Sequence, residues 1–210
     1  MRSYFFIIAF LFSSIVGLGQ EIDSVDEIAP FHEGLAAVRI GDQWGFINAD
    51  GDLVIDFRSD LVWNEEVSTG VEDITGIAYP RFKDDRCMIK ETLEEEGIDV
   101  YGFINSKGET VIKPEYLNVT EFNEGFALGI LLTKTFRGQN RFQLNIYDFK
   151  FSEVILDPAG DIMLLITQRQ SILMDKRRYE LPSLNAKYLS KTLMAVKTDK
   201  NTWELRKINL

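Results

Sequence analysis

The chain has 210 residues, of which 45% are hydrophobic, and a formal net charge of −10. This length and composition suffice to bury a core, which excludes a chain that is disordered throughout. The acidic balance argues against a nucleic-acid-binding protein, because affinity for phosphates comes largely from clustered Lys and Arg, and the single cysteine, Cys87, excludes an intrachain disulfide and a cysteine-based zinc site.

The first nineteen residues, "MRSYFFIIAFLFSSIVGLG", have the pattern of a secretory signal peptide. Arg2 precedes an apolar run, and the small residues Gly17 and Gly19 stand where cleavage before Gln20 is expected. The run is shorter than the roughly 20 residues that span a bilayer, which disfavours an uncleaved anchor. We therefore expect residues 20–210 to form an exported periplasmic or extracellular protein without stable membrane insertion.

A twelve-residue stretch then occurs twice. "WGFINADGDLVI" at 44–55 returns as "YGFINSKGETVI" at 101–112, with Gly, Phe, Ile, Asn, Gly, Val and Ile in the same places. Short runs of β-branched and aromatic residues between turn residues predict a β-meander. In its turn we expect Gly51 and Gly108 to hold positive φ, and the preceding Asn48 and Asn105 to bond the turn backbone through their side chains.

A second recurring element precedes each meander. "FHEGLAAV" at 31–38 matches "FNEGFALG" at 122–129, and "FKDDRCMI" at 82–89 fits the same frame. Cys87 takes the position of the small residue Ala36 in this frame. We therefore predict that Cys87 is a packed core side chain and not a nucleophile.

Three further units follow with weaker similarity. The spacing from Asn48 to Val54 and Ile55 returns between Asp148 and the pair Val154 and Ile155, which predicts a third unit. A hairpin is expected over 172–181, with Asp175 at the Asn position. Another hairpin, over 193–209, completes the series. It has Ala195-Val196 at the positions of Ala37-Val38 and Trp203 near the position of Trp44. The units are expected at about 31–57, 82–116, 122–155, 161–182 and 188–210. The predicted fold is an all-β array of repeated β-meander or hairpin units, stacked as a solenoid or partly wound like a propeller.

The run from Phe31 to Ile55 resembles the WG repeat family, named for a Trp-Gly pair that is present as Trp44-Gly45 and changed to Tyr101-Gly102 in the next copy. The resemblance covers residues 31–57 and 82–130. It implies β-rich repeats of exported or surface proteins, and it assigns no activity and no catalytic residue.

The residues themselves favour no enzyme. The only histidine, His32, occupies a position held by Lys83 and Asn123 in the other copies, so it is interpreted as a variable surface residue. "NADGD" at 48–52 resembles part of a calcium loop but lacks the later bidentate Glu, and turn chemistry explains it. We expect no catalytic residue, metal or cofactor, although a pair of carboxylates brought together by the fold stays an alternative.

Charge and aromatic residues supply the candidate binding sites. Residues 21–110 hold 22 acidic and 7 basic residues, whereas residues 111–210 hold 11 and 15. Ordinary surface solubility is the favoured explanation of this charge split. The functional alternative places the most acidic segment, with Glu94, Glu95 and Glu96, in a loop that meets a protein partner. Trp44 and Tyr101 recur at equivalent positions, which favours a core role over an exposed row that stacks on sugars.

These observations predict an exported, non-enzymatic module of the cell envelope that binds or scaffolds an unknown protein. A module that binds cell-surface carbohydrate through exposed aromatics is the first alternative. An unrecognised hydrolase is the second.

Overall fold

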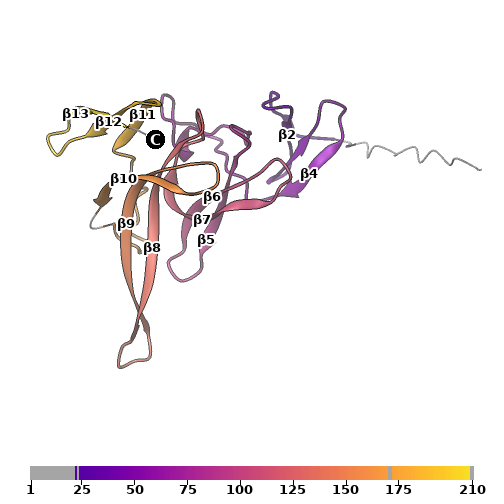
Figure 1. Cartoon of the computed structure of the whole chain (residues 1–210). Coiled ribbons are helices and arrows are strands. Elements are labelled where there is room, and N and C mark those ends of the chain that lie inside the picture. Colours follow the sequence, from indigo (N-terminus) through magenta and orange to yellow (C-terminus); the bar gives the residue numbers. More distant parts are fainter. Residues whose placement is uncertain (1–21, 23, 170–171, 209–210) are drawn as a thin grey trace, which may run out of the picture.

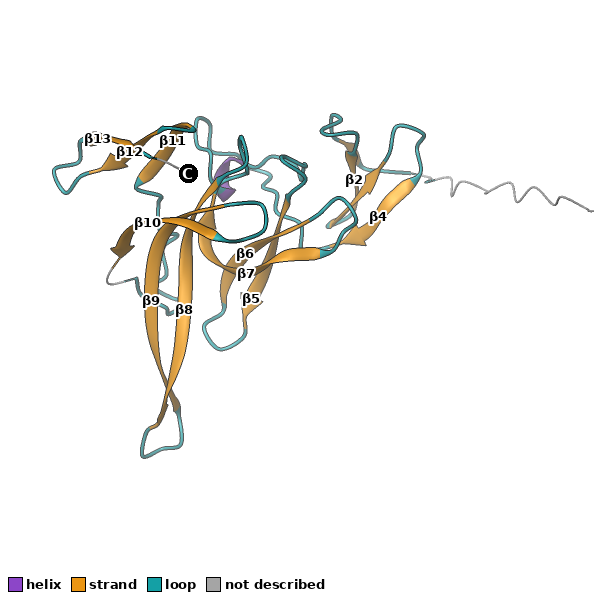
Figure 2. Cartoon of the chain, in the orientation of Figure 1, coloured by secondary structure: helices purple, strands orange, loops and turns teal. Residues whose placement is uncertain are grey.

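The computed structural model describes residues 22, 24–169 and 172–208, so the expected signal peptide lies outside the described residues and stays a prediction. The described part consists of thirteen β-strands and one short 3-10 helix, Ile74–Gly76 (Figure 2). The prediction of an all-β fold is confirmed.

The strands form three antiparallel sheets (Figure 1). The first sheet has the order β1 (Glu27–Ile28), β2 (Ala36–Ile40), β3 (Gln43–Ile47), β4 (Leu53–Arg58). The second contains, from one edge to the other, β10 (Ile162–Arg169), β9 (Asn145–Leu156), β8 (Ala127–Gln139), β7 (Thr110–Val119), β6 (Ile98–Ile104) and β5 (Cys87–Leu93). The third contains β11 (Ala186–Ser190), β12 (Leu193–Lys197) and β13 (Trp203–Lys207).

Apart from β1, which pairs with β2 at the edge of the first sheet, these strands make up four three-stranded meanders in the described part of the chain: β2–β4, β5–β7, β8–β10 and β11–β13. The second and third share one sheet because β7 pairs with β8. Each meander is a local structure, since its neighbouring strands are also neighbours in sequence.

The same kind of turn joins the second and third strand of every meander. A side-chain oxygen at the first position accepts a hydrogen bond from the backbone amide four residues later, and the residue at the fourth position has positive φ. The first positions are Asn48, Asn105, Asp157 and Thr198, and the fourth positions are Gly51, Gly108, Gly160 and Asn201. The turn predicted for the first two copies is confirmed, with φ of 86° at Gly51 and 80° at Gly108.

The expected turn position in the third unit was wrong. Asp148 lies within β9, opposite Thr135, and its carboxylate pairs with Arg137 at 2.9 Å. The turn of this meander begins instead at Asp157, because β8 and β9 are far longer than the strands of the first meander. Val154 and Ile155 consequently belong to the second strand of the meander and not to the third.

The last two units also differ from expectation. The segment 172–181 has a turn, in which the Asp175 carboxylate accepts from the Arg177 amide at 3.0 Å, but no strand. In the last meander Met194, and not Trp203, has the position of Trp44 as the buried second residue of the middle strand. Trp203 begins β13 and is 45% exposed. Ala195 and Val196 lie in the middle strand of their meander, whereas Ala37 and Val38 lie in the first strand of theirs. The predicted alignment of the last unit is therefore displaced by one strand.

The core repeats between successive meanders. Phe46 packs edge-on against Phe82 with ring centroids 4.8 Å apart, and the equivalent rings of Phe103 and Phe122 are also 4.8 Å apart one meander later. Cys87 is buried beside the first pair, and desolvation raises the pKa of its thiol. The prediction that Cys87 is a core side chain is confirmed.

Candidate functional site

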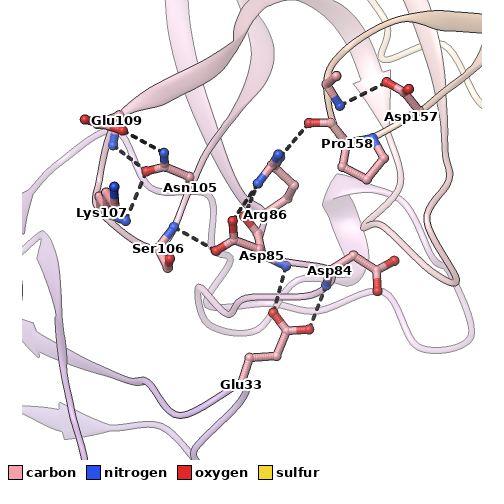
Figure 3. A network of polar contacts seen from close by, with 11 residues as sticks. Glu33, Asp84, Asp85, Arg86, Asn105, Ser106, Lys107, Glu109, Asp157 and Pro158 are labelled. Atoms are coloured by element: carbon pink, nitrogen blue, oxygen red, sulfur yellow. Dashed lines mark hydrogen bonds and ion pairs between the residues drawn. The ribbon is translucent and has the colours of Figure 1, made fainter.

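A ladder of carboxylates links the tight turns that precede the first three meanders. These turns are centred on Glu33-Gly34, Asp84-Asp85 and Glu124-Gly125, and all six residues have positive φ. The Glu33 carboxylate accepts from the amides of Asp84 and Asp85 at 2.7 and 2.8 Å (Figure 3). The Asp84 carboxylate in turn accepts from the Gly125 amide at 2.7 Å. Each acidic side chain therefore ties its own turn to the turn of the next meander.

Two more contacts extend the ladder to the turns inside the meanders (Figure 3). Asp85 accepts from the Ser106 amide at 3.1 Å, and Arg86 donates to the Pro158 carbonyl at 2.7 Å. Hydrogen bonding to Ser106, followed by the contact with Arg86, lowers the pKa of Asp85. These carboxylates satisfy backbone amides, so the ladder supports the arrangement of the meanders. Among the described residues, no group of three or more His, Cys, Asp or Glu side chains could hold a metal ion.

The aromatic candidates do not form an exposed row. Trp44 is 0% exposed and meets Trp63 edge-on with ring centroids 5.8 Å apart. Tyr101 is partly buried against a different core cluster, and desolvation raises the pKa of its phenol. The core interpretation is confirmed for Trp44, which is therefore removed as a surface for stacking a sugar.

The acidic candidates lie in the turn between β5 and β6, and two of them are already paired. Lys134 of β8 contacts the carboxylates of both Glu95 and Glu96, the latter at 2.8 Å. Glu94 is exposed, whereas only 7% of the Glu96 side chain is exposed. Hydrogen bonding from Lys134 lowers the pKa of Glu95. The charge count could not show that a distant lysine neutralises part of this segment.

Sequence reasoning missed the most conspicuous surface of the molecule. The β8–β9 hairpin projects away from the other strands (Figure 1), and large apolar side chains are exposed over its outer part. These are Phe136 at 57%, Phe142 at 68%, Leu144 at 62% and Ile146 at 46%. The signal that could have revealed it was the stretch from Glu124-Gly125 to the turn at Asp157, which is longer than the equivalent stretches that end at Asn48 and Asn105.

Comparison with known families agrees with this architecture. The model for the WG containing repeat matches residues 25–44, 44–66 and 101–128. The chain contains WG repeats. The WG matches cover the whole first sheet and resume within β6 up to the beginning of β8, so the first meander, part of the second and the connection to the third match the family model.

No curated protein and no solved structure matches this WG-repeat chain. In the described part of the chain, no helix combines the length and the apolar character needed to cross a membrane.

Proposed function

We propose that this WG-repeat chain is an exported, non-catalytic module of the cell envelope that binds or scaffolds another protein through the outer part of the β8–β9 hairpin, residues 133–150. The observation that carries the proposal is the exposure of four large apolar side chains on this one projecting element, with Phe142 at 68% the most exposed. Large apolar side chains that are exposed together on one projecting segment commonly mark a site of protein contact.

The chemistry around these residues suits a protein partner. Arg137 and Arg141 are exposed beside them, and the Arg141 guanidinium lies 4.8 Å from the centroid of the Phe142 ring. Aromatic residues and arginine are enriched in protein interfaces, where rings fill pockets and guanidinium groups meet carboxylates. An apolar surface with acidic residues at its rim is therefore the proposed counterpart.

The acidic turn belongs to the same proposed surface. Lys134 holds Glu95 and Glu96 against the hairpin, and the Tyr147 hydroxyl lies 3.4 Å from the Glu95 carboxylate. Glu94 beside them is exposed. Exposed charges of both signs would steer the encounter and set its orientation, so association is expected to slow as salt is raised.

The burial of Trp44 weighs against the alternative of carbohydrate binding through a row of exposed aromatic rings. A hydrolase would need carboxylates that face a substrate, whereas the clustered acids of the ladder accept hydrogen bonds from backbone amides. The exposed hairpin favours the hypothesis of protein binding.

Site-specific photo-crosslinking in the source cells tests this proposal. A benzophenone side chain at position 142 is expected to capture a discrete partner, and Leu144→Ser is expected to abolish the product. The matched control carries the same probe at Leu205, which is 65% exposed on β13. Identical products from both positions, or a product unaffected by Leu144→Ser, would contradict the proposal.

Export is tested separately by the intact mass of the protein recovered outside the cytoplasm. We expect the mature chain to start at Gln20 or Glu21. Recovery of an exported chain that still carries Met1 would contradict the signal-peptide hypothesis.

A further inference from the structure

A cleft of about 250 Å³ lies where the segment before β5 meets the third and fourth meanders. Its apolar walls come from distant parts of the chain, namely Ile77, Phe126, Leu128, Ile155 and Tyr188. This volume is below the ≈ 300–1,000 Å³ of sites for drug-sized ligands, so the cleft suits a small molecule or the end of a longer one. No residue of the hairpin surface 133–150 lines it.

Two cations share one carboxylate at the wall of this cleft. Glu121 accepts from Arg81 through both oxygens, with Nε–Oε1 at 2.6 Å and Nη2–Oε2 at 2.5 Å. Lys83 Nζ lies 2.7 Å from the same Oε2. All three residues line the cleft. One negative charge thus faces two positive charges, and neither cation has used all of its N–H donors on Glu121.

The ionised state of Glu121 follows from its partners. Only 13% of its side chain is exposed, and this burial by itself would raise the pKa. The hydrogen bonds from Arg81 and then Lys83 outweigh burial and lower the pKa of Glu121. Glu72 also lines the cleft, but it is exposed and its charge is screened by water. Around Glu121 itself two cations therefore face one carboxylate, whereas the four charged residues that line the cleft, with Glu72 included, sum to no net charge.

Tyr188 adds a polar group on the side of β11. Its hydroxyl oxygen is buried and has no hydrogen-bond partner among the described residues. Its ring lies 5.9 Å from that of Phe126, and desolvation raises the pKa of its phenol. A buried hydroxyl without a partner is unfavourable, and a ligand oxygen that bonds it would remove this cost.

We propose that this cleft binds a small organic carboxylate, either a free acid or the C-terminal carboxylate of a peptide. The anionic group lies against Arg81 and Lys83, and the apolar body of the ligand packs against Ile77, Phe126 and Leu128. Charge-assisted hydrogen bonds from two cations supply the selectivity for an anion. The proposal is independent of the hairpin surface, and its failure would leave that surface unaffected.

Matched pairs of acid and amide test the anion requirement on the whole protein. The probes are 3-phenylpropionate against 3-phenylpropionamide, and N-acetyl-Ala-Leu against the same dipeptide with an amidated C-terminus, titrated while backbone amide chemical shifts are recorded. We expect at least about tenfold tighter binding of each bound acid than of its amide, which corresponds to one charge-assisted hydrogen bond. Binding of 3-phenylpropionate alone would identify a free acid as the ligand class, and tighter binding of the dipeptide acid would identify a peptide terminus.

Two variants place the binding in this cleft. Lys83→Gln leaves the bidentate Arg81–Glu121 pair in place and is expected to weaken the acid about tenfold, and Tyr188→Phe is expected to weaken it by a smaller factor. Lys113→Gln, at an exposed position on β7 outside the cleft, is the matched control with unchanged affinity. Acids and amides that bind equally, no shifts with either acid at millimolar concentration, or full affinity in a folded Lys83→Gln variant would overturn the proposal.

Discussion

The two halves of the β8–β9 hairpin differ in the burial of their side chains, although continuous backbone pairing runs through both. In the inner half Ile130 and Leu156 are completely buried, because each of them packs in a core cluster with side chains from other strands. In the outer half Phe142 and Leu144 are exposed. Backbone pairing continues from Ala127–Leu156 to Gln139–Asn145, with a bulge near Gly138. Pairing alone therefore does not make a core, which requires neighbours on the faces of the strands.

This difference has a consequence for stability. A hairpin by itself is marginally stable in water, so the outer half depends on the anchored inner half. The exposed residues contribute little to folding, and they are free to contact another molecule.

The largest expected effect separates the two halves directly. Leu156→Ala should lower the free energy of unfolding by about 2–5 kcal/mol, because it opens a cavity in a packed core. Leu144→Ala, at a position that is 62% exposed, should change it by no more than about 0.5 kcal/mol. Urea denaturation of both variants measures this. Similar losses would mean that the outer half is packed in solution.

A smaller loss of stability is expected from substitutions in the turns of the first two meanders. Gly51→Val and Gly108→Val should each lower the free energy of unfolding by more than about 1 kcal/mol, since a β-branched residue is disfavoured at their positive φ. Gly108 should be the more sensitive, because a Cβ there would lie 3.3 Å from Ile55 Cγ2, whereas space is open around Gly51. Unchanged melting temperatures for both variants would contradict the role of these turns.

The stability of the folded protein should also depend on pH through the carboxylate of Glu121. Because its pKa is lowered on folding, ionised Glu121 stabilises the native state above its unfolded pKa of about 4.3, and this contribution is lost as the pH falls through the folded pKa. Glu121→Gln should be less stable at pH 7 and should lose less stability between about pH 5 and pH 3. Denaturation curves across this range measure it, with Glu94→Gln as the exposed control. An unchanged acid dependence in Glu121→Gln would contradict the assignment.

The smallest effect concerns the end of the hairpin. The turn there begins at Asn140, and its fourth residue, Gln143, has φ of 62°. In the first two meanders the fourth residue of the equivalent turn is a glycine, Gly51 or Gly108. Gln143→Gly should stabilise the hairpin end by at most about 1 kcal/mol, because relief of the left-handed strain is partly offset by the greater flexibility of glycine. Amide exchange of the outer strands measures this local change. Faster exchange in the variant would show that the turn differs from those of the meanders.

The sequence predicted the features that depend on neighbouring residues. The meanders, the turns at Gly51 and Gly108 and the packed position of Cys87 follow from alternation, turn chemistry and repeat alignment, and the structure confirms them. The third and fourth meanders were placed less well, because their long strands and substituted turn residues no longer match the first copy.

Contacts between distant segments were decided only by the tertiary structure. Glu33 meets Asp84 and Asp85 across 51 and 52 residues, and Lys134 pairs with Glu95 across 39. The charged group at the wall of the cleft likewise forms where Arg81 meets Glu121, 40 residues further along the chain. No local pattern encodes such pairs, because the partner of a charged side chain depends on how the meanders pack. The sequence by itself therefore determined the repeating unit, and packing determined which of its charged and apolar groups remain available for binding.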